Sequence, residues 1–361
     1  MEYLDYKRLK YKYSGRENVY NEILTRRISG FTQLPLSAKN GKPLVYTHSD
    51  EIISLLEEIS KAYESAEVDA VEFVVDEAYS TCTIEGAKST IADTIKLSHG
   101  KEPSNRSERM IKNNIKAIKQ VLNNGFSFDE YNILKLWKVI TENAADNTEI
   151  QGEKYRCDDV VIADTAGNIT FFAPSDDKIQ GMMEQLLNFI NSRDSLDVFI
   201  KAIIIHYFFV YIHPFCDGNG RCARLLMQNY LIKSGLDKFR GISISSGVLK
   251  NRSGYYNALE SSENIYNDIT FIIICYLEII RDTLYSACGG FGYQERHINM
   301  SARQKKVIEY LRKNKGNLIT TEIYAKRYGT DIDTAKAELT ALTEAGILSA
   351  YRNGRIEYKA K

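Results

Sequence analysis

Apolar residues recur at helical spacing along most of the chain. Residues 52–59 carry apolar side chains three and four positions apart, and the stretches 111–122 and 182–190 repeat this pattern. The stretch 199–212 is apolar on every side, which predicts a buried helix at the centre of the fold. Only 5 prolines interrupt the 361 residues. The pattern therefore predicts a mainly α-helical protein.

One segment has the composition of strands instead. Residues 159–163 (DVVIA) and 169–172 (ITFF) are rich in β-branched and aromatic side chains, which favour strands. Gly167 and Asn168 between them favour a turn. We therefore predict a lone β-hairpin among the helices.

A change of composition marks a second domain. Three glycines lie within residues 288–293 (CGGFGY), after an apolar helix predicted over 268–280. From residue 301 the pattern predicts three helices and then two short strands, which is the order of a winged helix. These last residues hold 13 Lys and Arg against 7 Asp and Glu, a balance that favours DNA binding. The acidic residues of the third helix favour protein docking or packing instead, and both interpretations stay open.

Composition excludes several classes of protein. Lys and Arg (47) balance Asp and Glu (47), so no overall charge attracts nucleic acid or an anionic membrane. No apolar run reaches the roughly 20 residues of a membrane-spanning helix. The N-terminal residues carry charges throughout, so we expect no cleaved signal peptide. The 6 cysteines show no CxxC spacing, which favours a reduced, cytosolic compartment.

The apolar helix leads directly into residues 213–224 (HPFCDGNGRCAR), where functional groups are concentrated. Gly218 and Gly220 remove side chains from this loop, so backbone N–H groups can face a ligand. These amides meet the positively polarised N-terminus of a helix that we expect to start near Arg221. The segment therefore predicts an anion site that can hold a di- or triphosphate.

Four side chains complete this predicted site. Arg221 and Arg224, three positions apart on the helix, offer guanidinium groups to phosphate oxygens. Asp217 offers a carboxylate where Mg²⁺ would join the phosphates. His213 offers a base with a pKa near neutrality. Together they predict a phosphoryl or nucleotidyl transferase in which a histidine takes the proton of an incoming hydroxyl group.

The same segment resembles the Fic family signature HPFxDGNGRxxR at every fixed position. The resemblance implies a Fic domain that transfers AMP from ATP to a Ser, Thr or Tyr hydroxyl of a protein and releases pyrophosphate. By this likeness His213 is the general base, Asp217 holds Mg²⁺, and Asn219 with the loop amides binds the α- and β-phosphates. Arg224 would hold the γ-phosphate, and Arg221 would support the loop and the phosphates.

The resemblance also gives two other segments a role. The predicted hairpin is similar to the Fic flap, which docks the target protein by strand addition. A region after the catalytic helix approaches the adenine in Fic proteins, although ordinary packing explains its tyrosines equally well. The residues concerned are Val160, Val161 and Ile162 for the flap, and Tyr255, Tyr256 and Asn257 for the adenine contacts.

A second short match lies upstream, in the sequence TCTIEG at residues 81–86. It resembles the inhibitory pattern [S/T]xxxE[G/N] of Fic proteins, with Thr81, Glu85 and Gly86 at its fixed positions, and its place before the catalytic segment is that of class II. A salt bridge from Glu85 to Arg224 would occupy the group that the γ-phosphate needs. The same carboxylate could instead orient water and remove AMP from a modified protein, and the sequence leaves both roles open.

His206 invites a metal-site interpretation because it lies seven residues before His213. On a helix the two residues are about 10 Å apart along the axis, too far to share a zinc ion. We therefore predict that His206 is a core histidine.

The predicted fold class is mainly α: a Fic-type helical bundle with a β-hairpin flap and a small C-terminal winged-helix domain. The predicted partners are ATP, a protein target for which the chain itself is one candidate, and DNA or protein at the winged helix. We also predict a homodimer and no membrane association. Alternatives are transfer of another nucleotide or phosphate-containing group, or a DNA-binding regulator whose Fic domain senses nucleotide. The predicted divisions are an N-terminal segment (1–48), N-terminal helices with the inhibitory one (49–110), the catalytic core (111–287), a linker (288–300) and the winged-helix domain (301–361).

Overall fold

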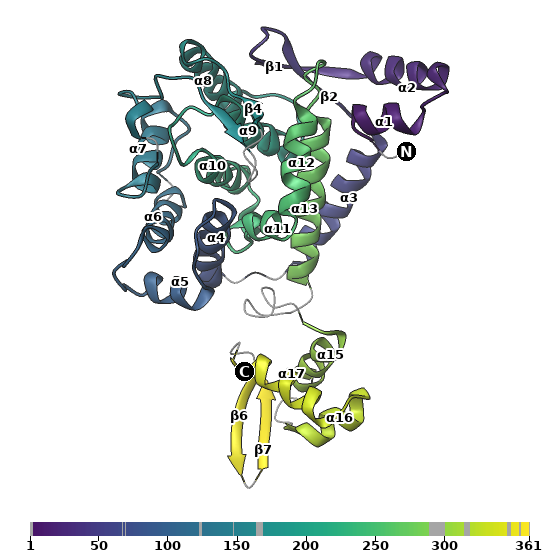
Figure 1. Ribbon diagram of the computed structural model, residues 1–361, viewed down its shortest axis with the longest axis vertical. Helices are drawn as coiled ribbons and strands as arrows, with labels where there is room; N and C mark the ends of the chain where they lie inside the picture. The colour runs from purple at the N-terminus through teal and green to yellow at the C-terminus, as the bar shows by residue number, and fades with distance from the viewer. Residues whose placement is uncertain are drawn as a thin grey trace. The chain divides into compact units, whose positions relative to one another are not determined.

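A computed structural model describes residues 3–66, 68, 70–122, 125–146, 148–163, 169–288, 300–313, 318–344, 348–353 and 355–360. The chain forms two compact units, Met1–Cys288 and Gly289–Lys361 (Figure 1). The turn predicted at Gly167 and Asn168 and the glycines predicted to mark the boundary fall outside the described residues.

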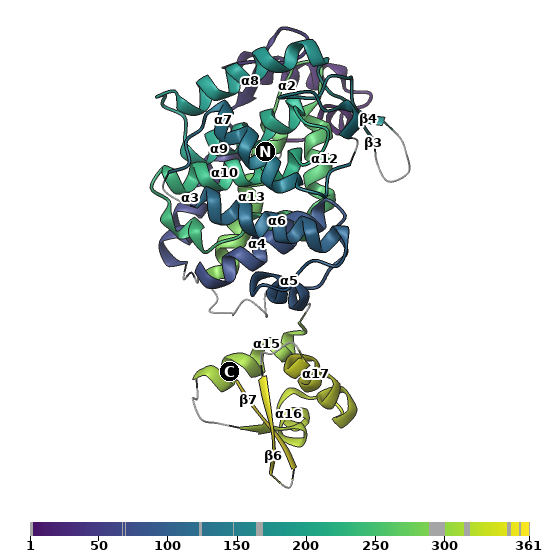
Figure 2. The same ribbon diagram turned by 90° about the vertical axis from the view of Figure 1, so that its left-hand side faces the viewer.

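The first unit is built mainly of helices, as the sequence predicts (Figure 2). Its α-helices are α1 (Tyr6–Lys12), α2 (Glu17–Ser29), α3 (Asp50–Ser65), α4 (Ala70–Ile84), α5 (Ile91–Ser98), α6 (Arg106–Val121), α7 (Glu130–Thr141), α8 (Asp176–Asn191), α9 (Val198–Ile212), α10 (Asn219–Lys233), α11 (Ile244–Lys250), α12 (Arg252–Ser262) and α13 (Thr270–Cys288). Short 3₁₀ turns lie at η1 (Thr148–Ile150) and η2 (Asp237–Arg240).

Capping side chains fix where two helices near residues 213–224 begin. Asn105 accepts a hydrogen bond from the Glu108 amide at the start of α6, and Asp197 accepts one from the Phe199 amide (2.8 Å) at the start of α9. Each cap satisfies an N–H group that the first turn leaves unpaired, which is worth about 1 kcal/mol.

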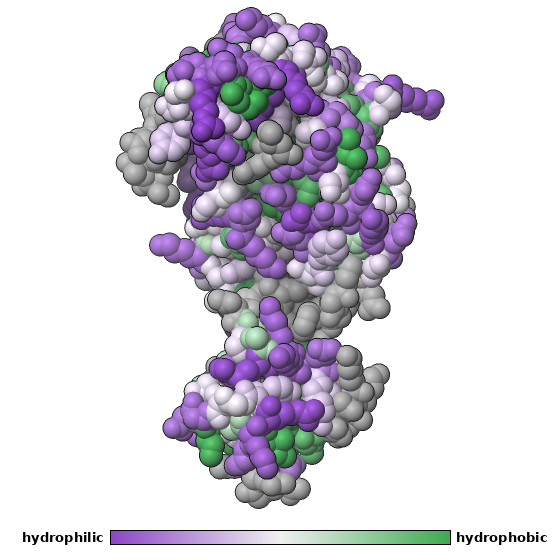
Figure 3. Space-filling model, turned by 90° about the vertical axis from the view of Figure 1, so that its right-hand side faces the viewer, coloured by the Kyte–Doolittle hydropathy of each residue, from purple (hydrophilic) through white to green (hydrophobic). Residues whose placement is uncertain are grey.

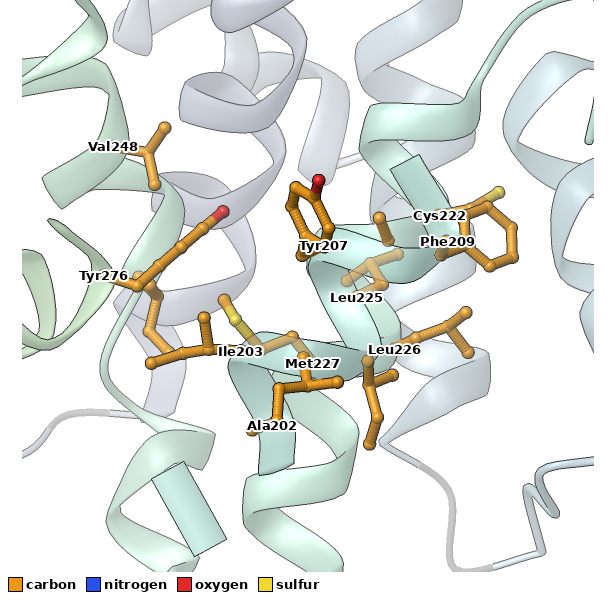
Figure 4. Close-up of a cluster of buried hydrophobic side chains, with 14 of the residues drawn as sticks. Ala202, Ile203, Tyr207, Phe209, Cys222, Leu225, Leu226, Met227, Val248 and Tyr276 are labelled. Carbon is orange, nitrogen blue, oxygen red and sulfur yellow. The ribbon is translucent and has the colours of Figure 1, made fainter. Parts of the chain in front are cut away.

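The predicted central helix, α9, is buried on nearly every side, and the prediction is confirmed. It packs against α10, and each large apolar side chain buried there contributes about 1.5–3 kcal/mol. The two helices hold both ends of the loop between Ile212 and Asn219. Figure 4 shows part of the packing, with Ala202, Ile203, Tyr207 and Phe209 of α9 and Cys222, Leu225, Leu226 and Met227 of α10.

Strands β3 (Val161–Ala163) and β4 (Ile169–Phe172) pair antiparallel, which confirms the predicted hairpin. The prediction that it is the only hairpin is wrong, because β1 (Phe31–Ser37) and β2 (Pro43–Thr47) form another. Leu34 and Leu36 are buried while Pro35 between them is exposed, so β1 has the alternation of a half-buried strand. Pro35 makes this strand hard to predict from the sequence, because proline within a sheet is confined to edge strands, first residues and bulges, and the register here shifts between Gln33 and Ser37.

The N-terminal residues are anchored to the helical bundle. The hydroxyl groups of Tyr3 and Tyr6 donate to Oδ2 of Asp268 (2.9 and 2.7 Å), a buried residue just before α13. Leu44 and Tyr46 of β2 belong to the same hydrophobic core as α9. The first strands and helices therefore help to support the core that carries residues 213–224.

The second unit has its own hydrophobic core. The predicted order of three helices and two strands is present, in α15 (Ala302–Lys313), α16 (Thr321–Tyr328), α17 (Ile332–Glu344), β6 (Leu348–Asn353) and β7 (Arg355–Ala360). A further strand, β5 (Ile319–Thr320), pairs with β7, so the sheet order is β5-β7-β6.

The surface is mostly hydrophilic on the face drawn in Figure 3, where hydrophobic side chains lie in small separate groups. Within the described ranges, no helix combines the length and the apolar composition that crossing a membrane requires.

Candidate active site

The loop between α9 and α10 has a tightly fixed backbone. His213 ends α9 in the left-handed conformation (φ 51°), which is uncommon for a residue other than glycine. Phe215 is buried and stacks on Trp137, with ring centroids 4.6 Å apart. Strained backbone of this kind persists where the surrounding packing imposes it, and it is concentrated at functional sites.

The imidazole of His213 is oriented by its own helix. Nδ1 lies 3.3 Å from the carbonyl oxygen of Val210, and because a carbonyl only accepts, Nδ1 carries the hydrogen. Nε2 then has the free lone pair. Burial is the main reason that the pKa of His213 is lowered to about 4, so the ring is neutral at physiological pH. A neutral imidazole with a free Nε2 can accept a proton.

Helix α10 begins at a glycine that tolerates no side chain. Gly218 has φ 85°, and a β-carbon on it would lie 2.8 Å from Cγ2 of Thr141. Asn219 then binds the loop to the helix, since its side chain donates to the Phe215 carbonyl (2.8 Å) and accepts from the Phe215 amide (3.0 Å). The amide side chain of Asn219 is thus engaged within the loop, and the backbone N–H groups of the first turn are what α10 presents.

Arg221 and Asp217 stabilise this loop through hydrogen bonds. Arg221 is fully buried, and its guanidinium donates to Oδ1 of Asp217 (2.8 Å) and to the carbonyl of Ile140 (3.3 Å). The other oxygen of Asp217, Oδ2, accepts from the Asp146 amide (3.1 Å) and lies 3.4 Å from the guanidinium of Arg106. The guanidinium of Arg221 therefore points into the protein interior, whereas the carboxylate of Asp217 is partly exposed to solvent.

Arg224 is the arginine that meets the predicted inhibitory segment. Its NH2 group lies 2.7 Å from Oε1 of Glu85 and donates to the Thr81 carbonyl (3.1 Å), while its Nε donates to the Thr81 hydroxyl (2.8 Å). Glu85 Oε1 also lies against Gly220, in the space that a β-carbon there would fill. The carboxylate thus lies over the first turn of α10, where backbone N–H groups and the helix dipole favour an anion.

The three residues predicted to contact adenine have different surroundings in the structure. Tyr255 is buried and bonds Nε2 of His206 (3.0 Å), whereas Tyr256 is 42% exposed. Asn257 is exposed and lines a hollow of about 440 Å³ beside the residues of α1. His206 is buried, as predicted, and the described residues contain no cluster of three metal ligands.

The hairpin presents two apolar side chains to solvent. Val161 (48% exposed) pairs in register with Phe172 (59% exposed), and Ile162 pairs with Phe171. The Ala173 amide donates to the Val160 carbonyl (3.0 Å) and closes the base of the hairpin.

Sequence reasoning missed two arginines at the site. Arg106 lies beside Asp217 and pairs with Asp146 (2.6 Å). Arg156 is buried and donates to the carbonyl of His213 (2.8 Å). Neither belongs to a recognisable pattern, because their partners come from distant segments and Arg156 contacts backbone oxygens, which every residue carries.

Comparison with known families identifies the central segment. Residues 127–231 match the model of the Fic/DOC family. The chain therefore carries a Fic/DOC-family domain, which includes α9, the loop and most of α10.

Curated relatives and solved structures agree with this assignment. A probable protein adenylyltransferase of Aquifex aeolicus (strain VF5) is 32% identical over 109 residues, which is 30% of this chain and 30% of that protein. The protein adenylyltransferase Fic of Nematostella vectensis is 31% identical over 130 residues, 35% of this chain and 28% of that protein. The match thus spans less than a third of either relative.

The fold itself extends further than these alignments. A crystal structure of a Fic family protein from Desulfovibrio desulfuricans G20 superposes with a TM-score of 0.60 over 88% of this chain and 97% of that chain, at 19% identity. A Fic domain containing signaling protein from Bacteroides thetaiotaomicron superposes with a TM-score of 0.50 over 67% of this chain and 98% of its own, at 21% identity. At these identities the structures establish the shared fold.

Proposed function

We propose that the chain is an autoinhibited protein adenylyltransferase of class II, which transfers AMP from ATP to a Ser, Thr or Tyr hydroxyl of a protein target. The observation that carries the proposal is the Glu85 carboxylate, which pairs with Arg224 at 2.7 Å and lies over Gly220. A site that holds a carboxylate in this way is built to bind an anion. The adenylyltransferase names of the relatives support ATP as that anion's source.

In the proposed reaction, Nε2 of His213 accepts the proton of the target hydroxyl. The hydroxyl oxygen forms a bond to the α-phosphorus of ATP, the bond from that phosphorus to the bridging oxygen breaks, and pyrophosphate leaves with the electron pair. The N–H groups at the start of α10 bind the phosphates, and Arg224 binds the γ-phosphate once Glu85 has moved away. Arg221 holds the loop through Asp217.

The residues present fit Mg²⁺ bound together with the nucleotide. Mg²⁺ usually takes one or two carboxylates and completes its octahedron with phosphates and water. Asp217 supplies one partly exposed carboxylate, whose Oδ2 lies 3.4 Å from the guanidinium of Arg106 and accepts a hydrogen bond from the Asp146 amide. The ion would neutralise charge on the phosphates. Asp217 is the proposed ligand.

The proposed inhibition is competition for Arg224. Glu85 occupies the guanidinium that the γ-phosphate needs, and its charge repels the triphosphate. The side chain of Glu85 is 31% exposed, so it can rotate into solvent without disturbing the packing of the core. The same carboxylate near an AMP-modified residue could orient water for AMP removal, which we keep as a second activity of the site.

Intact-protein mass spectrometry tests this proposal. The wild type, Glu85→Gly and a control, Glu57→Gly at an exposed position of α3, are incubated with Mg²⁺ and ATP, UTP or GTP. We expect a mass increment of one AMP, with ATP only, and to a far greater extent in Glu85→Gly than in the wild type or the control. An increment with UTP or GTP would favour the alternative of another nucleotide, and no increment with any nucleotide would contradict the proposed transferase activity.

A second function is supported by the C-terminal unit, which we propose to be a winged helix that binds DNA. Lys326 and Arg327 are exposed on α16, and the unit carries more basic than acidic residues. On this hypothesis the Fic domain would sense nucleotide for a DNA-binding regulator. The exposed face of α17 includes Ile332 and Asp333, which favours the alternative of a protein partner.

We expect the full chain to shift duplex DNA at low salt and to lose most of this binding at high salt, because phosphate contacts release counterions. The double variant Lys326→Ala/Arg327→Ala should weaken the shift about tenfold. A matched pair, Lys10→Ala/Lys12→Ala on α1, should not. No shift at low salt would remove the DNA-binding hypothesis and leave protein docking.

A further inference from the structure

Arg156 is a buried charge that the proposed reaction does not use directly. It is 2% exposed, and its guanidinium donates to three backbone carbonyls. Nε donates to the carbonyl of His213 (2.8 Å), NH1 to that of Asp158 and NH2 to that of Pro174. The Arg156 amide adds a hydrogen bond to the Pro214 carbonyl (2.9 Å). Burying a charge is costly, so this set of bonds needs an explanation.

The three carbonyls belong to the parts that have to meet in the proposed reaction. Asp158 precedes β3 and Pro174 follows β4, so these two carbonyls lie at the two legs of the hairpin. His213 carries the proposed base. A single planar group therefore joins both legs of the hairpin to the loop that holds the imidazole.

The chemistry of arginine suits this junction. The guanidinium is planar and presents its N–H donors at fixed angles, so three acceptors bound to one guanidinium are fixed relative to one another. A lysine ammonium is a point charge on a flexible stem and cannot impose the same geometry. A hydroxyl group presented by the hairpin has to reach Nε2 of His213 at about 3 Å, and a shift of about 1 Å costs about 100-fold in rate.

We propose that Arg156 is a positioning residue for AMP transfer, which sets the place of the target-binding hairpin relative to the His213 base. The proposal rests on the proposed function and on the role of target-docking flap that the family resemblance implies for the hairpin. Arg156 touches none of the reacting atoms and acts through two backbone segments.

The charge of Arg156 gives the proposal a second consequence. Burial is the largest cause of the low pKa of His213, and Arg156 lowers it further. The Val210 carbonyl, Glu85 and Asp217 act in the opposite direction. A substitution that removes the positive charge of Arg156 should therefore raise the pKa of His213. A substitution that keeps the charge but loses the planar guanidinium should leave this pKa unchanged.

Two variants in the Glu85→Gly background separate shape from charge. Arg156→Lys keeps the charge and loses the planar donors, so we expect kcat to fall about 10- to 100-fold, with KM for ATP within about twofold and the pKa of His213 unchanged. Arg156→Gln should lower kcat similarly and also raise the pKa of His213, measured by NMR of the imidazole. Arg27→Lys is the matched control, since Arg27 is also buried and donates to a carbonyl, that of Leu4 (2.7 Å).

Hydrogen exchange provides a measurement that does not depend on activity. The Ala173 amide closes the hairpin beside Pro174, so both Arg156 variants should speed its exchange about tenfold or more, and Arg27→Lys should not. Unchanged kcat in Arg156→Lys, or unchanged exchange at Ala173, would overturn the positioning role. If the Glu85→Gly parent transfers no AMP, the proposed function is contradicted, and the exchange experiment still decides whether Arg156 holds the hairpin to the His213 loop.

Discussion

Replacing Glu85 with glycine is expected to raise the rate of AMP incorporation about 10- to 100-fold at ATP concentrations below KM. The contact that is lost is a charge-assisted hydrogen bond of 2.7 Å to an arginine that is 2% exposed. Such bonds contribute about 1.5–3 kcal/mol, which is about 10- to 100-fold in occupancy of the site. Incorporation is measured as the initial rate of label transfer from ATP.

A graded series separates the two parts of this inhibition. Glu85→Gln removes the charge but keeps an oxygen that can accept from Arg224, so its rate should lie between those of the wild type and Glu85→Gly. Thr81→Val removes the acceptor for Nε of Arg224 (2.8 Å) while leaving Glu85 in place, and should change the rate only a few-fold. Equal rates for the wild type and Glu85→Gly would refute the assignment of Glu85 as the inhibitor.

The main helices of the fold are predictable because hydrophobic periodicity depends on local sequence. Helix α9 is an example, since apolar residues lie on every side of it and it is buried on nearly every side. The first hairpin escapes prediction because Pro35 lies inside β1, and because its pairing with β2 is identified by which side chains face the core, a tertiary property. Strand β5 is only two residues long and acquires its identity from pairing with β7.

The sequence predicts which residues make up the candidate site, but not how their side chains are arranged. Arg221 and Arg224 are equivalent in the sequence, three positions apart on one helix. The structure buries Arg221 against Asp217 and directs Arg224 toward Glu85. This difference depends on α4, whose Thr81 lies 143 residues away in the chain, and no local pattern contains it. The resemblance to a family signature suggests the roles of the two arginines, and only the packing shows which of them is paired with Glu85.

The second large effect concerns His213, for which asparagine is the best replacement. His213 has left-handed backbone, and asparagine adopts that conformation more readily than alanine, so His213→Asn should fold normally. In the Glu85→Gly background it should reduce AMP transfer about 100- to 10,000-fold, the range of a positioned general base. Nucleotide binding should persist, since Arg224 and the first turn of α10 are unaffected. Retained transfer would remove His213 from the reaction.

The low pKa of His213 predicts how its ring titrates in the free protein. An ordinary histidine has a pKa near 6.5 and is about 90% protonated at pH 5.5, whereas a group with a pKa of about 4 is almost wholly neutral there. The pKa of His213 is lower in the folded than in the unfolded chain. The contribution of this difference to the free energy of unfolding is therefore fully present above about pH 6.5 and is lost as the pH falls toward 4. NMR of ¹³C-labelled histidine, assigned by the signal missing in His213→Asn, should show the neutral form down to about pH 5. A titration midpoint of His213 near pH 6.5 would mean that the ring is solvated. Desolvation would then not be what keeps the imidazole neutral.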